Sequence, residues 1–197
     1  YMPILIVSIL FFEILLTQWR NREKYFEIGS KIDGLTNLFN RRYVTEVLAQ
    51  LEKKVDAEYA VILMDLDHFK TINDQYGHEV GDQVLVQIAE ILTANVRAFD
   101  TVGRFGGEEF ILILNHHNLE KVYEIAERCR KQIEEEEIQL KDGTSLCITA
   151  SFGIALSKGA IGQDCIIREA DQALYLAKAQ GRNQVRKSCE IEASSIF

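Results

Sequence analysis

A glycine turn that carries two acids joins two apolar runs in the middle of the chain. The turn is Gly106–Glu109, between Thr101–Phe105 and Phe110–Leu114. Two β-prone runs around a short glycine turn favour a β-hairpin. Adjacent carboxylates at a hairpin tip contribute little to a core, but they suit divalent metal ions, which prefer oxygen ligands on a rigid support.

A second apolar run, Val61–Met64, ends in the acidic sequence Asp65-Leu66-Asp67. Residues two apart on a strand face the same side, so we expect both aspartates to face one site. If this strand pairs with the hairpin, Asp65 and Glu108 share a metal ion. Magnesium is held by one or two carboxylates, which leaves positions for phosphates and water. The alternative is that these acids are solvated residues that end strands.

The rest of the chain alternates between helical and strand patterns. Helical spacing is found in 41–55, 80–95, 119–136 and 165–179, and strand composition in 60–66 and 145–154. Helices and strands in this order, with a hairpin between them, predict an α+β fold in which helices cover a mixed sheet.

Several segments resemble, in family order, the motifs of the GGDEF family, the diguanylate cyclases, and residues 106–110 match its GGEEF variant. The other segments are Asp33–Arg42, Met64–Asp74, Tyr76–Asp82, Ser151–Gly153 and Ala170–Asn183. The resemblance implies a ferredoxin-like palm, similar to class III nucleotide cyclases, with a central mixed sheet and an additional N-terminal helix. One departure is Asn37, where the family usually has glycine. Asn tolerates left-handed backbone angles, so we expect the turn to survive.

The resemblance implies that two GTP molecules condense into cyclic di-GMP and two pyrophosphates. Asp65, Glu108 and the backbone carbonyl of Leu66 match the family's metal ligands. Two Mg²⁺ or Mn²⁺ ions in each half-site would activate the attacking 3′-hydroxyl and offset charge on the leaving group. Glu109 is the third predicted catalytic residue with Asp65 and Glu108, as a metal contact or as the acid that positions the nucleophile. Its alternative is stabilisation of the turn.

Two polar residues match the family's guanine-reading pair. Asp82 can accept hydrogen bonds from the guanine N1–H and amino group, whereas Asn73 can both donate and accept. Their alternative is helix capping. A pair that reads guanine rejects ATP, which argues against an enzyme that makes another cyclic nucleotide. A catalytically inactive receptor for cyclic di-GMP is a further alternative, and the complete metal and guanine set argues against it.

Four residues match positions that contact the GTP phosphates in the family. The backbone N–H groups at Phe69 and Lys70 are expected at the start of a helix, where they bind phosphate. Lys178 and Arg182 lie four residues apart, which predicts that one helix face presents both. Their alternative is a solvated basic pair at the end of a helix.

The segment Arg97–Asp100 resembles the family's inhibitory RxxD motif. An arginine can grip a phosphate or a guanine edge through two parallel hydrogen bonds. Arg128 matches a position from which a partner's basic residue contacts the inhibitor. The resemblance therefore implies product feedback inhibition at Arg97, Asp100 and Arg128. It also implies a homodimer, because each domain is a half-site and must present its GTP to the other.

Composition and charge indicate which classes of ligand the chain can bind. The chain has 197 residues with a net charge of −8, and this argues against the basic surface that a nucleic-acid polymer requires. Metal ions can neutralise both acids and phosphates, so a nucleotide ligand stays compatible. The four cysteines have no Cys-x-x-Cys spacing, which favours reduced thiols over a zinc site.

Three segments are predicted: 1–32 is an apolar and connecting helix, 33–187 is the GGDEF domain, and 188–197 is a tail. The apolar run 4–16 is followed by Trp19 and a basic cluster, which is typical of the cytoplasmic end of a transmembrane helix. A helix over that run spans roughly 20 Å, short of a bilayer core, so a buried or dimer-forming helix is the alternative. We expect an inner-membrane anchor with the catalytic domain in the cytoplasm, or alternatively a soluble cytoplasmic protein.

Overall fold

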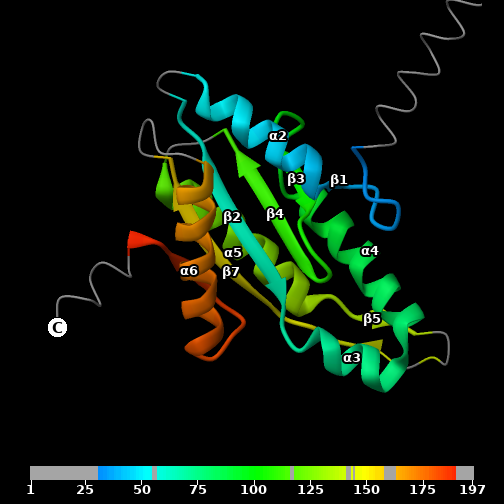
Figure 1. Cartoon of the computed structure of the whole chain (residues 1–197). Helices are drawn as coiled ribbons and strands as arrows, with labels where there is room; N and C mark the ends of the chain where they lie inside the picture. Colours follow the sequence, from blue (N-terminus) through cyan, green and yellow to red (C-terminus); the bar gives the residue numbers. More distant parts are fainter. Residues whose placement is uncertain are drawn as a thin grey trace, which may run out of the picture. The chain divides into compact units, whose positions relative to one another are not determined.

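The computed structural model describes residues 31–54, 57–115, 118–140, 143, 145–157 and 163–189. From Asp33 onward they belong to one compact unit (Figure 1). The strands are β1 (Phe39–Asn40), β2 (Ala60–Leu66), β3 (Thr101–Arg104), β4 (Glu109–Leu114), β5 (Ile138–Gln139), β6 (Ser145–Leu146), β7 (Ala150–Leu156) and β8 (Val185–Lys187). The helices are α2 (Arg41–Glu52), α3 (Phe69–Tyr76), α4 (His78–Ala94), α5 (Leu119–Glu135) and α6 (Gln163–Ala179).

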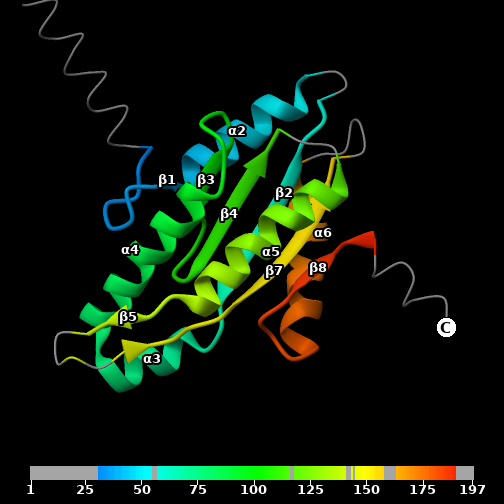
Figure 2. The same cartoon turned by 180° about the vertical axis from the view of Figure 1, so that it is seen from behind.

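The central sheet has the strand order β1-β3-β4-β2-β7-β8, and β5 pairs with β6 in a small separate sheet. Strand β2 lies in the middle, antiparallel to both β4 and β7, and every one of its residues is buried. Figure 1 views the sheet from the side of α2 and α6, and Figure 2 from the side of α4 and α5. Because both faces of β2 are covered, its apolar run is continuous rather than alternating.

Helix α6 packs unusually close to β7 at Gly153. A Cβ atom at this position would lie 2.1 Å from the carbonyl oxygen of Ala170 and 2.3 Å from the backbone nitrogen of Leu174. Real Cβ contacts are never that short, so only glycine permits this approach of helix and strand. The close packing sets the position of α6 and therefore the place of Lys178 in its last turn.

The predicted fold class is confirmed, and β2 has the predicted bounds, 60–66. The hairpin is formed by β3 and β4, antiparallel over four residue pairs. The predicted strand 145–154 was wrong in extent, because the chain leaves the small sheet after Leu146 and the central strand starts at Ala150. Strands β1, β5 and β8 were not predicted, since two or three residues carry no periodicity. Asn37 adopts a φ of 58°, as expected for the position where the family has glycine.

No helix of the described part of the chain is long and apolar enough to cross a bilayer. The predicted membrane segment 4–16 and most of the tail 188–197 lie outside the described residues. The membrane anchor and the three-segment division therefore stay predictions.

The cysteines differ in exposure, and this predicts their reactivity. Burial raises the pKa of the Cys129 thiol to about 12, whereas Cys147 and Cys189 are exposed. Because the thiolate is the reactive form, we expect a thiol reagent at neutral pH to modify the two exposed cysteines and spare Cys129 until the domain unfolds. The raised pKa also means that stability falls as pH rises from about 9 toward about 12, where only the unfolded thiol ionises. Mass spectrometry of labelled peptides measures the pattern, and equal labelling of Cys129 would contradict it.

Candidate active site

The two predicted metal carboxylates meet at the end of β2. Register pairs Asp65 with Glu109 rather than with Glu108, because Glu108 still belongs to the turn. The turn nevertheless comes beside the strand end, since the Leu66 N–H donates to the Glu108 carbonyl oxygen at 3.4 Å. Sheet pairing thus brings a strand-end aspartate and a turn glutamate together.

Both carboxylates are held in surroundings that disfavour negative charge. Burial raises the pKa of Asp65, and the ammonium of Lys178, 2.8 Å from its Oδ2, opposes that effect. Burial also raises the pKa of Glu108, and the nearby charge of Asp65 raises it further. The charge of Asp67 also raises the pKa of Asp65, so a cation placed at this strand end would stabilise the ionised carboxylates.

The oxygen ligands at this strand end suit a metal ion that binds together with a nucleotide. Among the residues that the structure describes, no three Asp, Glu, His or Cys side chains form a ready-made metal cage. Magnesium does not need such a cage, because phosphate oxygens and water complete its octahedron around one or two carboxylates. Asp65, Glu108 and the carbonyl of Leu66 therefore fit a nucleotide-borne ion better than a permanent structural metal.

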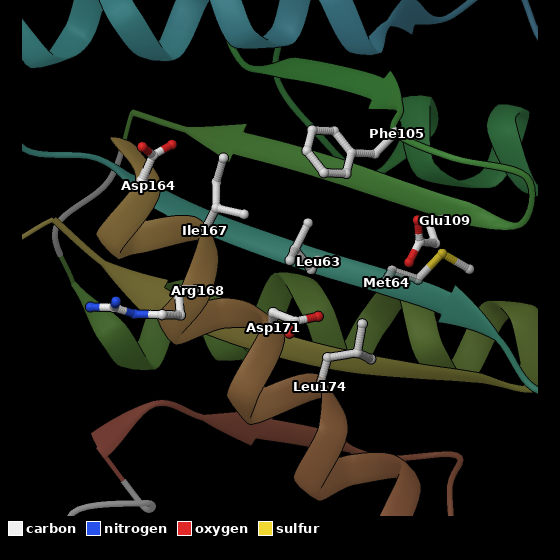
Figure 3. A pocket seen from close by; sticks show the side chains of 9 residues that line it. All are labelled: Leu63, Met64, Phe105, Glu109, Asp164, Ile167, Arg168, Asp171 and Leu174. Carbon is white, nitrogen blue, oxygen red and sulfur yellow. The ribbon is translucent and has the colours of Figure 1, made fainter. Parts of the chain in front are cut away.

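Glu109 lies beside this site but lines a cavity of about 250 Å³ between the hairpin and α6. Figure 3 shows Glu109 and Phe105 on the hairpin side, Asp171 and Leu174 on α6, and Leu63 of β2 between them. Its carboxylate forms no ion pair or side-chain hydrogen bond within the described ranges. The catalytic role expected for Glu109 stays a prediction.

The hairpin turn is clamped by Arg104, to which we assigned no role from the sequence. Its Nε and Nη2 donate to the Gly107 carbonyl oxygen at 3.1 and 2.8 Å, and its Nη1 donates to Asp33 Oδ1 at 3.2 Å. Asp33 also accepts hydrogen bonds from Thr36, so it joins the turn to the beginning of the domain. In the sequence, the position of Arg104 two residues before the glycine turn is the signal that could have indicated this role.

The predicted guanine pair lies at the corner where α3 meets α4. A Cβ atom at Gly81 would lie 2.0 Å from Asn73 Oδ1, so the Asn73 amide rests on the backbone immediately before Asp82. The missing side chain at Gly81 therefore lets the two helices approach and brings the pair together. Asp82 is exposed and Asn73 is partly exposed, which leaves their polar atoms accessible to a base.

The chain turns sharply between β2 and α3. His68 adopts a φ of 57°, and α3 begins at Phe69, whose side chain is buried, while the side chain of Lys70 is exposed. The start of α3 thus lies directly after β2, the strand that carries Asp65, as the sequence predicted. The use of these N–H groups for phosphate stays a prediction.

The prediction that one helix face presents Lys178 and Arg182 was wrong. Helix α6 ends at Ala179, and Gly181, with a φ of +116°, turns the chain out of the helix. Arg182 lies in this turn with a φ of 63°, and its N–H donates to the Ala177 carbonyl oxygen at 3.0 Å. The positive charge of Arg182 still acts on the site, since it lowers the pKa of Asp65 and so opposes the effect of burial.

The predicted inhibitory residues lie around the end of α4, but they are anchored differently. Asp100 is buried, and its carboxylate accepts hydrogen bonds from the backbone N–H groups of Arg97 and Asn115 at 3.0 and 3.1 Å. Arg97 has an exposed side chain, with its guanidinium 5.8 Å from the Phe99 ring centroid. In this structure Asp100 therefore shapes the loop and leaves Arg97 as the accessible member of the motif.

Arg128 projects from α5 toward the same corner. Its Nε donates to Asn95 Oδ1 at 2.6 Å and its Nη2 to the Asn95 carbonyl oxygen at 2.7 Å. Asn95 lies two residues before Arg97, so the structure brings the two arginines to one region of the surface. Their joint binding of a product molecule stays a prediction.

Comparison with known proteins decides the family. The model of the GGDEF domain, described as a diguanylate cyclase domain, matches residues 30–184. The chain belongs to the GGDEF family. Its GGDEF domain is 41% identical over 167 residues to the uncharacterized protein YhcK of Bacillus subtilis, covering 82% of this chain and 46% of that protein.

Two further proteins resemble the GGDEF domain closely. The diguanylate cyclase DosC of Escherichia coli K12 is 35% identical over 162 residues, which cover 81% of this chain and 35% of DosC. The coiled coil and GGDEF domain of DgcB from Caulobacter crescentus, solved in complex with c-di-GMP, is 28% identical with a TM-score of 0.84, over 89% of this chain and 94% of that one. The chain spans less than half the length of the two curated relatives.

Proposed function

We propose that this chain is a diguanylate cyclase that condenses two GTP molecules into cyclic di-GMP and two pyrophosphates. The observation that carries the proposal is the proximity of Asp65 and Glu108 at the end of β2, where the charge of Asp65 raises the pKa of Glu108 and Lys178 lies 2.8 Å from Asp65. Carboxylates and a cation at one strand end can bind metal ions and phosphates together. Family membership supports the same reaction.

Different residues of the site would bind the guanine base, the phosphates and the metal ions. Asn73 and Asp82 would hold the guanine base, and the start of α3 would bind phosphate oxygens through backbone N–H groups. Asp65, Glu108 and the Leu66 carbonyl would hold two Mg²⁺ or Mn²⁺ ions, which when bound lower the pKa of the attacking 3′-hydroxyl and stabilise the leaving pyrophosphate. Lys178 and Arg182 would contribute positive charge on the α6 side.

One domain supplies half of the reaction, so the proposal includes a homodimer. Each domain would present its GTP to the 3′-hydroxyl of the other, and alignment of the two substrates would supply much of the rate. Product bound at Arg97 and Arg128 would hold the domains apart from this arrangement and so inhibit the enzyme.

The test is incubation of the purified chain with GTP and Mg²⁺, with the product identified by mass. Cyclic di-GMP in amounts that rise with protein concentration supports the cyclase. Absence of product at every protein concentration, with tight binding of cyclic di-GMP, would contradict it and favour a receptor.

Asp82→Ala tests the guanine assignment. Because an unpaired polar group rejects the wrong base, we expect the preference for GTP over ATP to fall by about 100-fold or more. Steady-state kinetics with both nucleotides measures the ratio. Glu90→Ala removes another exposed carboxylate from α4 and should leave it unchanged. An unchanged preference in the Asp82 variant would show that this residue does not read the base.

Arg97→Ala tests the inhibitory assignment. The initial rate should stay within about twofold of the parent, since the side chain lies outside the proposed catalytic site. Product should accumulate to higher concentration, because the accessible arginine of the motif is lost. Progress curves with added cyclic di-GMP measure this, with the exposed Arg42→Ala as the control. A stall at the parent's product concentration would contradict the assignment.

A further inference from the structure

A buried polar network lies behind the metal carboxylates. Asp67, two residues after Asp65, is only 4% exposed. Its Oδ1 accepts a hydrogen bond from Ser151 at 2.7 Å, and its Oδ2 accepts from the Thr149 hydroxyl at 2.7 Å and from the Asn183 N–H at 3.0 Å. Because the Asp67 carboxylate already accepts three hydrogen bonds, it serves the fold and not a metal ion.

Asn183 connects this carboxylate to α5. Its Oδ1 accepts from Arg130 Nη1 at 2.7 Å, and its Nδ2 donates to Glu134 Oε1 at 2.7 Å. Arg130 is itself buried and pairs with Glu127 and Glu134 at 2.8 Å. Asn183 is therefore held through its backbone from the β2 side and through its side chain from the α5 side.

Arg182 directly precedes Asn183 in the turn that follows α6. The two residues have φ values of 63° and 45°, so the turn uses the left-handed region twice in succession. Asn is tolerated there better than most residues. Within the described ranges the Arg182 guanidinium forms no hydrogen bond or ion pair, so its location is set by the backbone of this turn.

We propose that Asn183 is a positioning residue for substrate binding: by tying the turn to Asp67 and Arg130, it places Arg182 beside Asp65. The inference rests on the proposed function, because Arg182 matters here as a contact for the GTP phosphates. The Asn183 side chain then positions the guanidinium of Arg182 relative to Asp65 at the end of β2. Loss of this link should weaken GTP binding more than it slows the chemical step.

The experiment is a double-mutant cycle between Asn183→Gly and Arg182→Ala. Glycine keeps the left-handed turn while it removes the two side-chain hydrogen bonds. We expect Asn183→Gly alone to raise KM for GTP about tenfold with kcat within about twofold, and to have no further effect in the Arg182→Ala background. Binding of a non-hydrolysable GTP analogue by calorimetry should show the same coupling without turnover.

Glu120→Gln is the matched control. It weakens the ion pair of Glu120 with Lys187, 2.8 Å apart, which also joins α5 to the C-terminal strand but does not reach Asp67. We expect KM for GTP to be unchanged in this variant. A rise as large as in the Asn183 variant would show that any loss between these elements disturbs the site, which would overturn the inference.

Exchanging the donor and the acceptor of the hydrogen bond between Asn183 and Glu134 provides a rescue experiment. Asn183→Asp places a carboxylate against Glu134 and should raise KM, whereas the combination with Glu134→Gln restores a donor and should return KM toward the parent value. Equal effects of Asn183→Gly with and without Arg182 would overturn the inference while leaving the cyclase intact. A parent chain that binds no GTP analogue would overturn the proposed function and this inference together.

Discussion

Glu108→Gln is expected to abolish cyclic di-GMP synthesis while the domain stays folded. Loss of a residue that merely supports a metal ligand costs 10- to 100-fold in metal affinity, so loss of a direct carboxylate ligand should cost at least about 100-fold in rate. Folding should not suffer, because burial and the charge of Asp65 raise the pKa of Glu108, and its ionised form is disfavoured. Product formation with GTP and Mg²⁺ measures the first effect, and thermal unfolding without ligand measures the second.

Glu124→Gln is the matched control for this prediction, since it removes an exposed carboxylate from α5. The Glu124 variant should keep the activity of the parent, and GTP with Mg²⁺ should raise its unfolding temperature as much as that of the parent. Full activity in the Glu108 variant would show that Glu108 is not a metal ligand. It would then leave Asp65, with its ion pair to Lys178, as the remaining carboxylate of the site.

Gly153→Ala is expected to destabilise the domain by about 3 kcal/mol or to prevent folding, at the upper end of the costs of overpacking. The added methyl group would meet the backbone of Ala170 and Leu174, and backbone atoms inside a helix cannot rotate away. If the protein folds, α6 must shift from β7, and the ion pair between Lys178 and Asp65 should weaken with it. Urea unfolding measures the free-energy change, and GTP binding measures the effect on the site.

The control for this prediction is Gly34→Ala, where a Cβ atom would meet nothing within 4 Å. Its midpoint of unfolding should stay close to that of the parent. An equally stable Gly153 variant would show that α6 and β7 can separate without loss, and the position of Lys178 would then need another explanation.

Local pattern was sufficient for the central strand and the hairpin. β2 is a continuous apolar run because it is buried on both faces, and the glycine turn marks the connection between the two apolar strands β3 and β4. The candidate metal carboxylates follow from the same pattern, since Asp65 ends one run and Glu108 ends the turn. Signals of this kind depend on neighbours in sequence, which a single chain displays directly.

Register and helix ends could not be predicted in the same way. Glu109, and not Glu108, is aligned with Asp65 across the sheet, because strand pairing determines where the turn ends. Arg182 does not lie on the helix face that its spacing predicted, because α6 ends at Ala179, three residues before Arg182, and Gly181 turns the chain out of the helix. The register depends on hydrogen bonds between strands far apart in the chain, whereas α6 ends at a left-handed turn in which the Arg182 N–H donates to the Ala177 carbonyl oxygen.

The sequence by itself determined the order of the longer helices and strands, the apolar core, and the residue types available for metal, base and phosphate. Only the tertiary structure decided which polar groups serve the fold. Asp65 and Asp67 are two residues apart, yet one pairs with Lys178 near the proposed metal site and the other is satisfied by Ser151, Thr149 and Asn183. The reason is physical: a buried carboxylate takes its role from the donors that distant segments bring to it, and spacing along the chain does not specify those donors.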